Sequence, residues 1–419
     1  MSTRFLSNRA TPAETAMKVA ILSKADRSGG GASRCAEDLV AQFRHHNHHA
    51  DHFARSSRYE ETLPLYTQNE KKIYHRLLSL GLQELIPFEK KVIRQHDEQH
   101  HYDLFHFHDL STAISPLTLK WLSDHHRPVI WTLHDCSPVT GGCINPLGCD
   151  KYQTHCFPCP QINTLPLGKN LDLSFLFRKL KAYVHHKSHI HYVAPSKWLA
   201  DFVYDTGLLD RYPTIIPNGV DTRLFCAHDK HAIRQALSLP EDRFVILLSS
   251  AAKNNPFKGL YFAINVIDKL RELNPFILVV GEKDPALLGR LTTFDYRCTG
   301  FIADREVLGK YYSAADIYLN TTIAEVQSIA SLEAMSSQTP VFGFKTGGVP
   351  ELITQGEDGV LVDNRDTGAL AHHIITAYRS GHLSVMGQNA RKKVEDNYSM
   401  ELLFQRYLQL YRDVINGIR

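Results

Sequence analysis

The chain has 419 residues, 43% of them hydrophobic, and a formal net charge of +3 at pH 7. Two domains with separate cores fit this length and apolar content, and the nearly balanced charge argues against nucleic acid as the main partner. No run of the ~18 apolar residues needed to span a bilayer is present, which excludes a transmembrane helix.

Two segments in the N-terminal part of the chain are relevant to the cellular location of the protein. Residues 1–16 contain no apolar run that could act as a signal peptide, so we expect a disordered extension, a cytoplasmic protein and mostly reduced cysteines. Residues 71–94 mix basic and apolar positions in a helical pattern that Pro87 interrupts. This surface suits peripheral contact with anionic lipid at the inner face of a membrane, or an amphipathic helix packed on the first sheet.

A glycine loop follows the first predicted strand. Residues 18–23 have a buried-strand pattern, and Gly29, Gly30 and Gly31 lie between that strand and a helical pattern. Free backbone amides and the helix dipole make such a loop a phosphate-binding geometry. A dinucleotide fingerprint needs a third glycine where the chain has Arg34, which argues against a dehydrogenase. An ordinary turn between strand and helix is the alternative.

Two further strands are predicted at residues 102–108 and 128–134. Both end in polar residues, and open α/β sheets bind their ligands at this edge. His134 closes the second strand, while His106 and His108 occupy the first. Because the chain has 24 histidines, some are expected at strand ends by chance.

A cysteine-rich insert is predicted at residues 141–160. Four cysteines fall within 17 residues of it and could hold a structural zinc ion: Cys143, Cys149, Cys156 and Cys159. The first spacing, Cys-x5-Cys, is longer than that of common zinc sites. Reduced thiols that pack a loop, or disulfides formed after purification, are the alternatives.

The second half of the chain repeats the alternation of strands and helices. Strand patterns at residues 244–249, 276–281, 316–320 and 360–362 predict a second doubly wound α/β unit. The turn-forming sequence Pro217-Asn218-Gly219 sets the domain boundary. We therefore expect an N-terminal domain over residues 17–216, a C-terminal domain over 217–397, and a final helix over 398–419 that returns to the N-terminal domain.

The most informative block starts at Glu325. Seven residues separate it from Glu333, and the sequence Gly-Gly-Val-Pro-Glu follows at residues 347–351. A loop glutamate, a second glutamate at a helix start and a glycine turn can supply acceptors for sugar hydroxyls and N–H donors for a diphosphate. Two solvated helix glutamates are the alternative.

This block resembles the donor-site signature of the family 4 retaining glycosyltransferases. The resemblance runs from about residue 17 to the C-terminus and implies the GT-B fold, in which two Rossmann-like domains face each other across a cleft. It implies that Glu325 contacts the transferred sugar, Glu333 the nucleotide ribose, and Lys258 the diphosphate, with His134 beside the sugar. It also places the following residues around the donor: Gly29, Gly30, Gly31, Lys253, Gln327 and Ser328.

The chain departs from the family pattern at two points. Lys253 replaces an arginine, and Val326-Gln327-Ser328 replaces a glycine-rich start, so the donor pocket is expected to be reshaped. No Asp-x-Asp pair occurs, which favours catalysis without a metal cofactor. A similar insert in transferases of bacterial polysaccharide assembly implies that the cysteine insert shapes the acceptor side.

The predicted function is transfer of a sugar, with retention, from a nucleotide-sugar donor to a glycan or lipid-linked acceptor in surface polysaccharide or lipopolysaccharide assembly. Two other classes fit the same residues. One is a GT-B sugar-nucleotide epimerase, and the other is a non-catalytic nucleotide-sugar binding protein.

Overall fold

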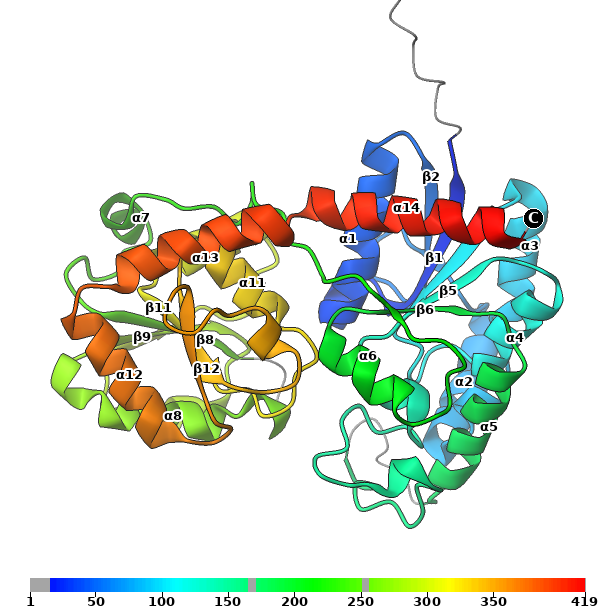
Figure 1. The fold of residues 1–419 in the computed structure, drawn as a ribbon, viewed down its shortest axis with the longest axis horizontal. Coiled ribbons are helices and arrows are strands. Elements are labelled where there is room, and N and C mark those ends of the chain that lie inside the picture. Colours follow the sequence, from blue (N-terminus) through cyan, green and yellow to red (C-terminus); the bar gives the residue numbers. More distant parts are fainter. Residues whose placement is uncertain (1–15, 165–170, 251–255, 419) are drawn as a thin grey trace, which may run out of the picture.

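The structure is a computed structural model that describes residues 16–164, 171–250 and 256–418. Two β-sheets, of seven and six strands, lie in two domains side by side (Figure 1). Every strand pairing within the sheets is parallel, and separate clusters of buried hydrophobic residues cover the two faces of each sheet. The predicted α/β class is therefore confirmed, because parallel strands require helical crossovers that cover both faces.

The N-terminal sheet has the order β3-β2-β1-β4-β5-β6-β7. The strand order reverses between β1 and β4, and open α/β sheets bind ligands at such a point. The strands are β1 (Lys18–Ala25), β2 (His49–Ser56), β3 (Leu63–Pro64), β4 (Leu104–His108), β5 (Val129–Thr132), β6 (His191–Ala194) and β7 (Thr214–Ile215). The helices are α1 (Gly31–His45), α2 (Gln68–Leu80), α3 (Lys90–His100), α4 (Pro116–Asp124), α5 (Ser174–His186) and α6 (Lys197–Tyr204).

The C-terminal sheet has the order β10-β9-β8-β11-β12-β13, with the reversal between β8 and β11. Its strands are β8 (Val245–Ser250), β9 (Phe276–Gly281), β10 (Tyr296–Cys298), β11 (Ile317–Asn320), β12 (Val341–Phe344) and β13 (Gly359–Val362). The helices that follow β7 in the chain are α7 (Lys230–Ala236), α8 (Leu260–Lys269), α9 (Pro285–Arg290), α10 (Arg305–Ala314), α11 (Ile329–Ser336), α12 (Thr367–Arg379), α13 (Leu383–Asn397) and α14 (Met400–Ile418), of which α14 packs on the N-terminal domain.

The chain passes between the domains twice, at neighbouring places. The first passage follows β7, and Val220 there pairs with Ser399, which lies in the second passage just before α14. Helix α14 then lies across the N-terminal domain beside α1 (Figure 1). It buries Phe404 and Tyr411 in the same hydrophobic cluster as Phe43, whose ring stacks on Tyr411 at 4.9 Å between centroids. The last helix is thus part of the N-terminal core.

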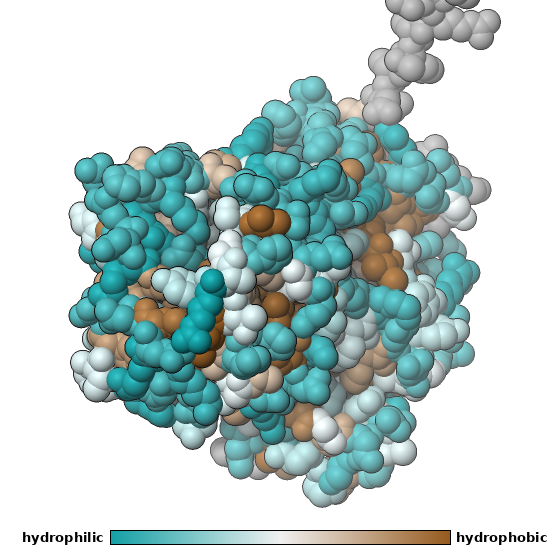
Figure 2. Space-filling model, turned by 60° about the vertical axis from the view of Figure 1, so that its left-hand side comes forward, coloured by the Kyte–Doolittle hydropathy of each residue, from teal (hydrophilic) through white to brown (hydrophobic). Residues whose placement is uncertain are grey.

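The surface carries polar side chains over most of the face shown in Figure 2, where hydrophobic residues form small separate patches. Within the described ranges, no helix combines the length and the apolar character that a membrane span requires.

Candidate active site

The glycine loop of the N-terminal domain lies against the C-terminal domain. It connects β1 to α1, and Gly30 has a φ of +98°, which a residue with a side chain rarely adopts. A Cβ atom on Gly31 would lie 3.2 Å from Cδ1 of Ile329, the first residue of α11. The loop therefore faces the N-terminus of α11 closely enough that both can contact one ligand.

Asp26 holds the start of this loop. Its carboxylate accepts hydrogen bonds from the backbone N–H of Ser28 at 2.9 Å and of Arg58 at 2.5 Å, and from the Ser57 hydroxyl at 3.0 Å. Burial raises the pKa of Asp26, but the hydrogen bonds outweigh it and lower the pKa to about 2. An ionised, fully bonded aspartate thus fixes the loop at the end of β1.

Lys258 and Glu325 form an ion pair at the edge of the C-terminal sheet. The Lys258 Nζ lies 3.1 Å from Glu325 Oε2, and both side chains are partly exposed. The negative charge of Glu325 raises the pKa of Lys258 above its usual value, against the effect of burial. Beneath them, the buried Tyr318 shares a 2.7 Å hydrogen bond with the Ser249 hydroxyl. The pair presents one cation and one carboxylate to the same solvent-accessible space.

Glycines allow the neighbouring turns to approach this pair. Gly259 has a φ of +61°, and a Cβ atom there would lie 1.9 Å from the carbonyl oxygen of Thr321. Gly347 has a φ of +54°, and its Cβ would lie 1.6 Å from the carbonyl oxygen of Glu325. The backbone N–H of Gly348 donates to the Val326 carbonyl at 3.1 Å. The downstream glycine turn therefore supports the backbone that carries Glu325.

Glu333 lies in the second turn of α11, so the predicted position at the helix start is wrong. The helix starts earlier because Ser328 is its N-cap and accepts a hydrogen bond from the Ser331 N–H at 3.2 Å. The side chain of Glu333 is 3% exposed and pairs with Arg34 Nη1 of α1 at 3.1 Å. Burial raises the pKa of Glu333, while Arg34 and Arg305 oppose that rise.

Gln327 and Ser328 are predicted to contact the donor, but their side chains form hydrogen bonds within the protein. Gln327 Oε1 accepts a 2.7 Å hydrogen bond from the Asn218 N–H in the domain crossing. Ser328 caps α11, as described above, and its hydroxyl also accepts from the Asn320 amide at 3.3 Å. The backbone N–H groups of Gln327 and Ser328 therefore remain as candidate hydrogen-bond donors to a phosphate. Lys253 lies outside the described residues.

His134 follows β5 at the carboxyl edge of the N-terminal sheet. Its Nε2 atom lies 2.9 Å from Nδ1 of His108, which is buried at the end of β4. Burial lowers the pKa of His134 to about 4, although the charge of Asp109 opposes this. His134 is therefore neutral at pH 7 and can accept or donate a hydrogen bond without carrying charge.

Further contacts join the domains at positions that the sequence did not single out for this role. Arg305 Nη1 of α10 lies 2.6 Å from Asp38 Oδ1 of α1. The carboxylate of Glu351, the last residue of the glycine turn, accepts from the N–H groups of Lys197 at 2.8 Å and Trp198 at 2.7 Å, and so caps α6. In the sequence, these charged residues could be noticed only because they lie beside the two glycine motifs. The folded structure is needed to show which residues of the other domain they contact.

The cysteine insert follows the carboxyl end of β5 in the chain and forms loops at the lower end of the N-terminal domain in Figure 1. All four of its cysteines are free thiols, and they line one cavity of about 10 Å³. Among the described residues, no three of these sulfur atoms lie within 4.8 Å of one another. Burial raises the pKa of Cys143 to about 11, and it also raises the pKa of Cys156 and of Cys159.

Two models of known protein families match this chain. The model described as "Glycosyltransferase Family 4" matches residues 29–224, and that described as "Glycosyl transferases group 1" matches residues 243–380. Together they cover well over half of the chain and both domains. The chain belongs to the family 4, group 1 glycosyltransferases, which confirms the resemblance inferred from the glutamate block.

Individual proteins agree with this assignment. Lipopolysaccharide 1,2-N-acetylglucosaminetransferase of Salmonella typhimurium is 24% identical over 231 residues, which cover 51% of this chain but only 60% of that enzyme. Sucrose-phosphate synthase from Thermosynechococcus elongatus matches with a TM-score of 0.72 and 20% identity over 96% of this chain and all of that one. Anabaena HepE in complex with UDP matches with a TM-score of 0.69 and 18% identity, over 95% and 100%. These structures confirm the GT-B fold.

Proposed function

We propose that this chain is a retaining glycosyltransferase that transfers a sugar from a nucleotide-sugar donor to a glycan or lipid-linked acceptor in surface polysaccharide or lipopolysaccharide assembly. The observation that carries the proposal is the Lys258–Glu325 pair, held beside the N-terminus of α11, which the glycine loop of the other domain approaches. A cation, a carboxylate and free amides from two domains together suit a sugar diphosphate.

The donor would lie with its diphosphate between Lys258, the N-terminus of α11 and the loop at Gly29 to Gly31. Each of these supplies positive charge or N–H donors. Glu333 would accept from the ribose hydroxyls. Because Glu333 pairs with Arg34 in this structure, donor binding would require the ribose to share or replace that contact. Arg34 thereby connects nucleotide binding to the approach of the two domains.

The chemistry needs charge stabilisation more than proton transfer by the protein. As the bond to the sugar breaks, negative charge grows on the leaving diphosphate, and Lys258 and the α11 N-terminus would meet it. Glu325, released from Lys258, would hold a hydroxyl of the transferred sugar. We expect this set of groups to work without a metal cofactor, since no Asp-x-Asp pair is present in the sequence. Attack from the face of the leaving phosphate would give retention.

The acceptor would enter from the N-terminal domain. His134 ends β5 there, and its lowered pKa, about 4, supplies a neutral imidazole to border the sugar. The cysteine insert follows this strand in the sequence and would form one wall of the acceptor site.

A panel of sugar nucleotides tests the proposal. Ligand at a hundred times its dissociation constant stabilises a protein by about 2.7 kcal/mol, so the cognate donor should raise the melting temperature. Lys258→Ala should reduce both this shift and sugar transfer, whereas Lys269→Ala, which removes an exposed lysine of α8, should change neither. Stabilisation by no sugar nucleotide, or transfer by Lys258→Ala at the rate of Lys269→Ala, would contradict it.

A lipid-linked acceptor would require the enzyme to meet a membrane, and α2 offers a surface for this contact. Ile73 and Leu80 on this helix are 49% and 58% exposed, and Lys71 and Lys72 supply positive charge. We expect the protein to co-sediment with vesicles that contain phosphatidylglycerol and less with vesicles of phosphatidylcholine alone. An Ile73→Gln, Leu80→Gln double variant should lose this binding; unchanged binding would assign any membrane contact to another surface.

A further inference from the structure

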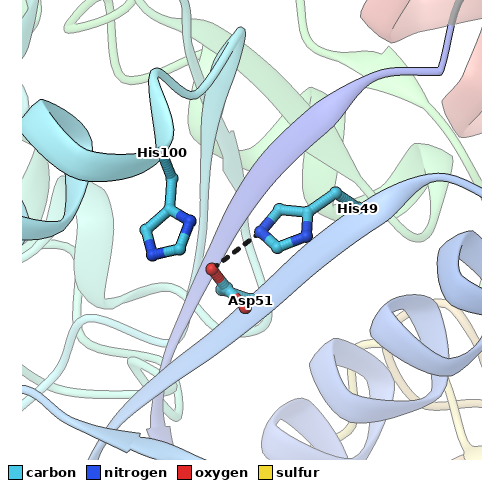
Figure 3. A group of neighbouring side chains, drawn as sticks. All are labelled: His49, Asp51 and His100. Carbon is cyan, nitrogen blue, oxygen red and sulfur yellow. Dashed lines mark hydrogen bonds and ion pairs between the residues drawn. The ribbon is translucent and has the colours of Figure 1, made fainter.

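A second group of chemically active side chains lies far along the N-terminal sheet from the glycine loop. His49 and Asp51 come from the start of β2, and His100 is the last residue of α3 (Figure 3). His49 pairs with Lys18 at the amino end of β1, whereas the glycine loop follows the carboxyl end of the same strand. The group is therefore at the amino ends of these strands, whereas the candidate active site is at the carboxyl ends.

The three side chains point into one space. One potential ligand atom from each lies within 4.8 Å of the other two. His49 Nε2 lies 3.0 Å from Asp51 Oδ2, as the dashed line in Figure 3 marks, and the rings of His49 and His100 stack at 5.5 Å. The Tyr102 hydroxyl donates to the same Asp51 oxygen and orients the carboxylate.

Sequence spacing explains why these residues converge. His49 and Asp51 are two residues apart on a strand, so both side chains project from the same face of the sheet. His96 precedes His100 by four residues on α3, which places both imidazoles on one face of the helix. Their rings stack at 6.0 Å, and the buried Nδ1 atom of His96 has no hydrogen-bond partner. His96 thus lies beside His100 on α3, but it is not one of the three residues whose ligand atoms lie within 4.8 Å of one another.

We propose that His49, Asp51 and His100 bind a divalent transition-metal ion of the zinc, nickel and copper class. Two imidazoles and a carboxylate are a ligand set that such ions favour over calcium or magnesium. Binding would replace the His49–Asp51 hydrogen bond with metal bonds, while Tyr102 would keep orienting the carboxylate, as outer partners of metal ligands commonly do.

The bound ion would join the start of β2 to the end of α3. Because this edge of the sheet is remote from the glycine loop, the metal would stabilise the N-terminal domain and take no part in sugar transfer.

Nickel titration of the full-length, tag-free protein tests the site. Isothermal titration calorimetry should detect a nickel-binding step in the wild type that His49→Gln and His100→Gln each weaken by roughly tenfold or more, since even an outer partner of a metal ligand contributes 10–100-fold. His75→Gln removes an exposed histidine of α2 and serves as the matched control.

Thermal melting supplies the second measurement. Nickel should raise the melting temperature of the wild type and of His75→Gln, but not that of His49→Gln or His100→Gln, and all four should melt alike without metal. Cobalt spectra separate this site from the cysteine insert, because only thiolate ligands give sulfur-to-cobalt charge-transfer bands. Nickel binding and stabilisation that are equal in all four proteins would overturn the proposal.

Discussion

A single methyl group at Gly347 should displace Glu325, the glutamate that we propose holds the transferred sugar. The Cβ atom of Gly347→Ala would meet the carbonyl oxygen of Glu325 at 1.6 Å, a distance that must open to at least 3.0 Å. Both partners are backbone, so no flexible side chain can absorb the change. A misplacement of about 1 Å at a reacting centre can reduce the rate about 100-fold.

Gly356→Ala provides a control with the same backbone strain. Gly356 has a φ of +80° and Gly347 one of +54°, but a Cβ atom on Gly356 would meet nothing within 4 Å. The left-handed conformation costs a residue with a side chain about 1–2 kcal/mol. Gly356→Ala should lose about this much stability, and Gly347→Ala should lose more because only it carries the added contact with Glu325.

Urea unfolding and donor-dependent transfer should be measured on both variants. We expect Gly356→Ala to transfer sugar close to the wild-type rate and Gly347→Ala to fall about 100-fold below it while still folded. If Gly347→Ala transferred at the rate of Gly356→Ala, the glycine turn would not position Glu325, and this reasoning would be refuted.

Four further predictions address the remaining assignments. Lys258→Ala should lower kcat by about 100–1000-fold, with Lys258→Arg less affected; near-wild-type turnover would remove Lys258 from the mechanism. By calorimetry with nucleoside diphosphates, Glu333→Gln should weaken binding, whereas Glu325→Gln should mainly slow transfer; the opposite order would exchange their roles. His134→Ala should reduce kcat without lowering the melting temperature. Because the folded pKa of His134 is lowered from 6.5 to about 4, its neutral form contributes stability above pH 6.5 that is lost as the pH falls towards 4. A kcat inflection near pH 6.5 that disappears in His134→Ala would contradict this. A structural zinc ion at the four cysteines of the insert would require their sulfur atoms to lie closer together than in this structure. If it binds there, the protein should hold about one zinc ion per chain and single Cys→Ser changes should lower stability non-additively; little metal with four titrating thiols would contradict it.

The features that could be predicted from the sequence are local ones. Alternating strand and helix patterns indicated parallel α/β units, since each strand is a short apolar run bounded by polar residues. The glycine motifs could be recognised because positive φ angles and close backbone approach need glycine. Gly259 and Gly347 show both requirements in the structure.

The features that could not be predicted depend on residues distant in the sequence. Arg34 and Glu333 are separated by 299 positions, and Glu351 caps a helix of the other domain. No local pattern encodes how two domains meet. Strand β2, with the sequence His-Ala-Asp-His-Phe-Ala-Arg-Ser, also gave no clear strand signal, because polar residues interrupt its apolar positions. The start of α11 was misplaced because Ser328 was not recognised as its N-cap.

The most direct test of the central claim is time-resolved NMR of the wild-type protein with the donor selected from the panel, labelled with ¹³C at the anomeric carbon, and an acceptor extract. The account predicts a new glycosidic signal with the same anomeric configuration as the donor, and its absence with Lys258→Ala. Three results would contradict it. An inverted product would exclude retention, an epimerised nucleotide sugar would indicate an epimerase, and a donor that binds without reacting would indicate a binding protein.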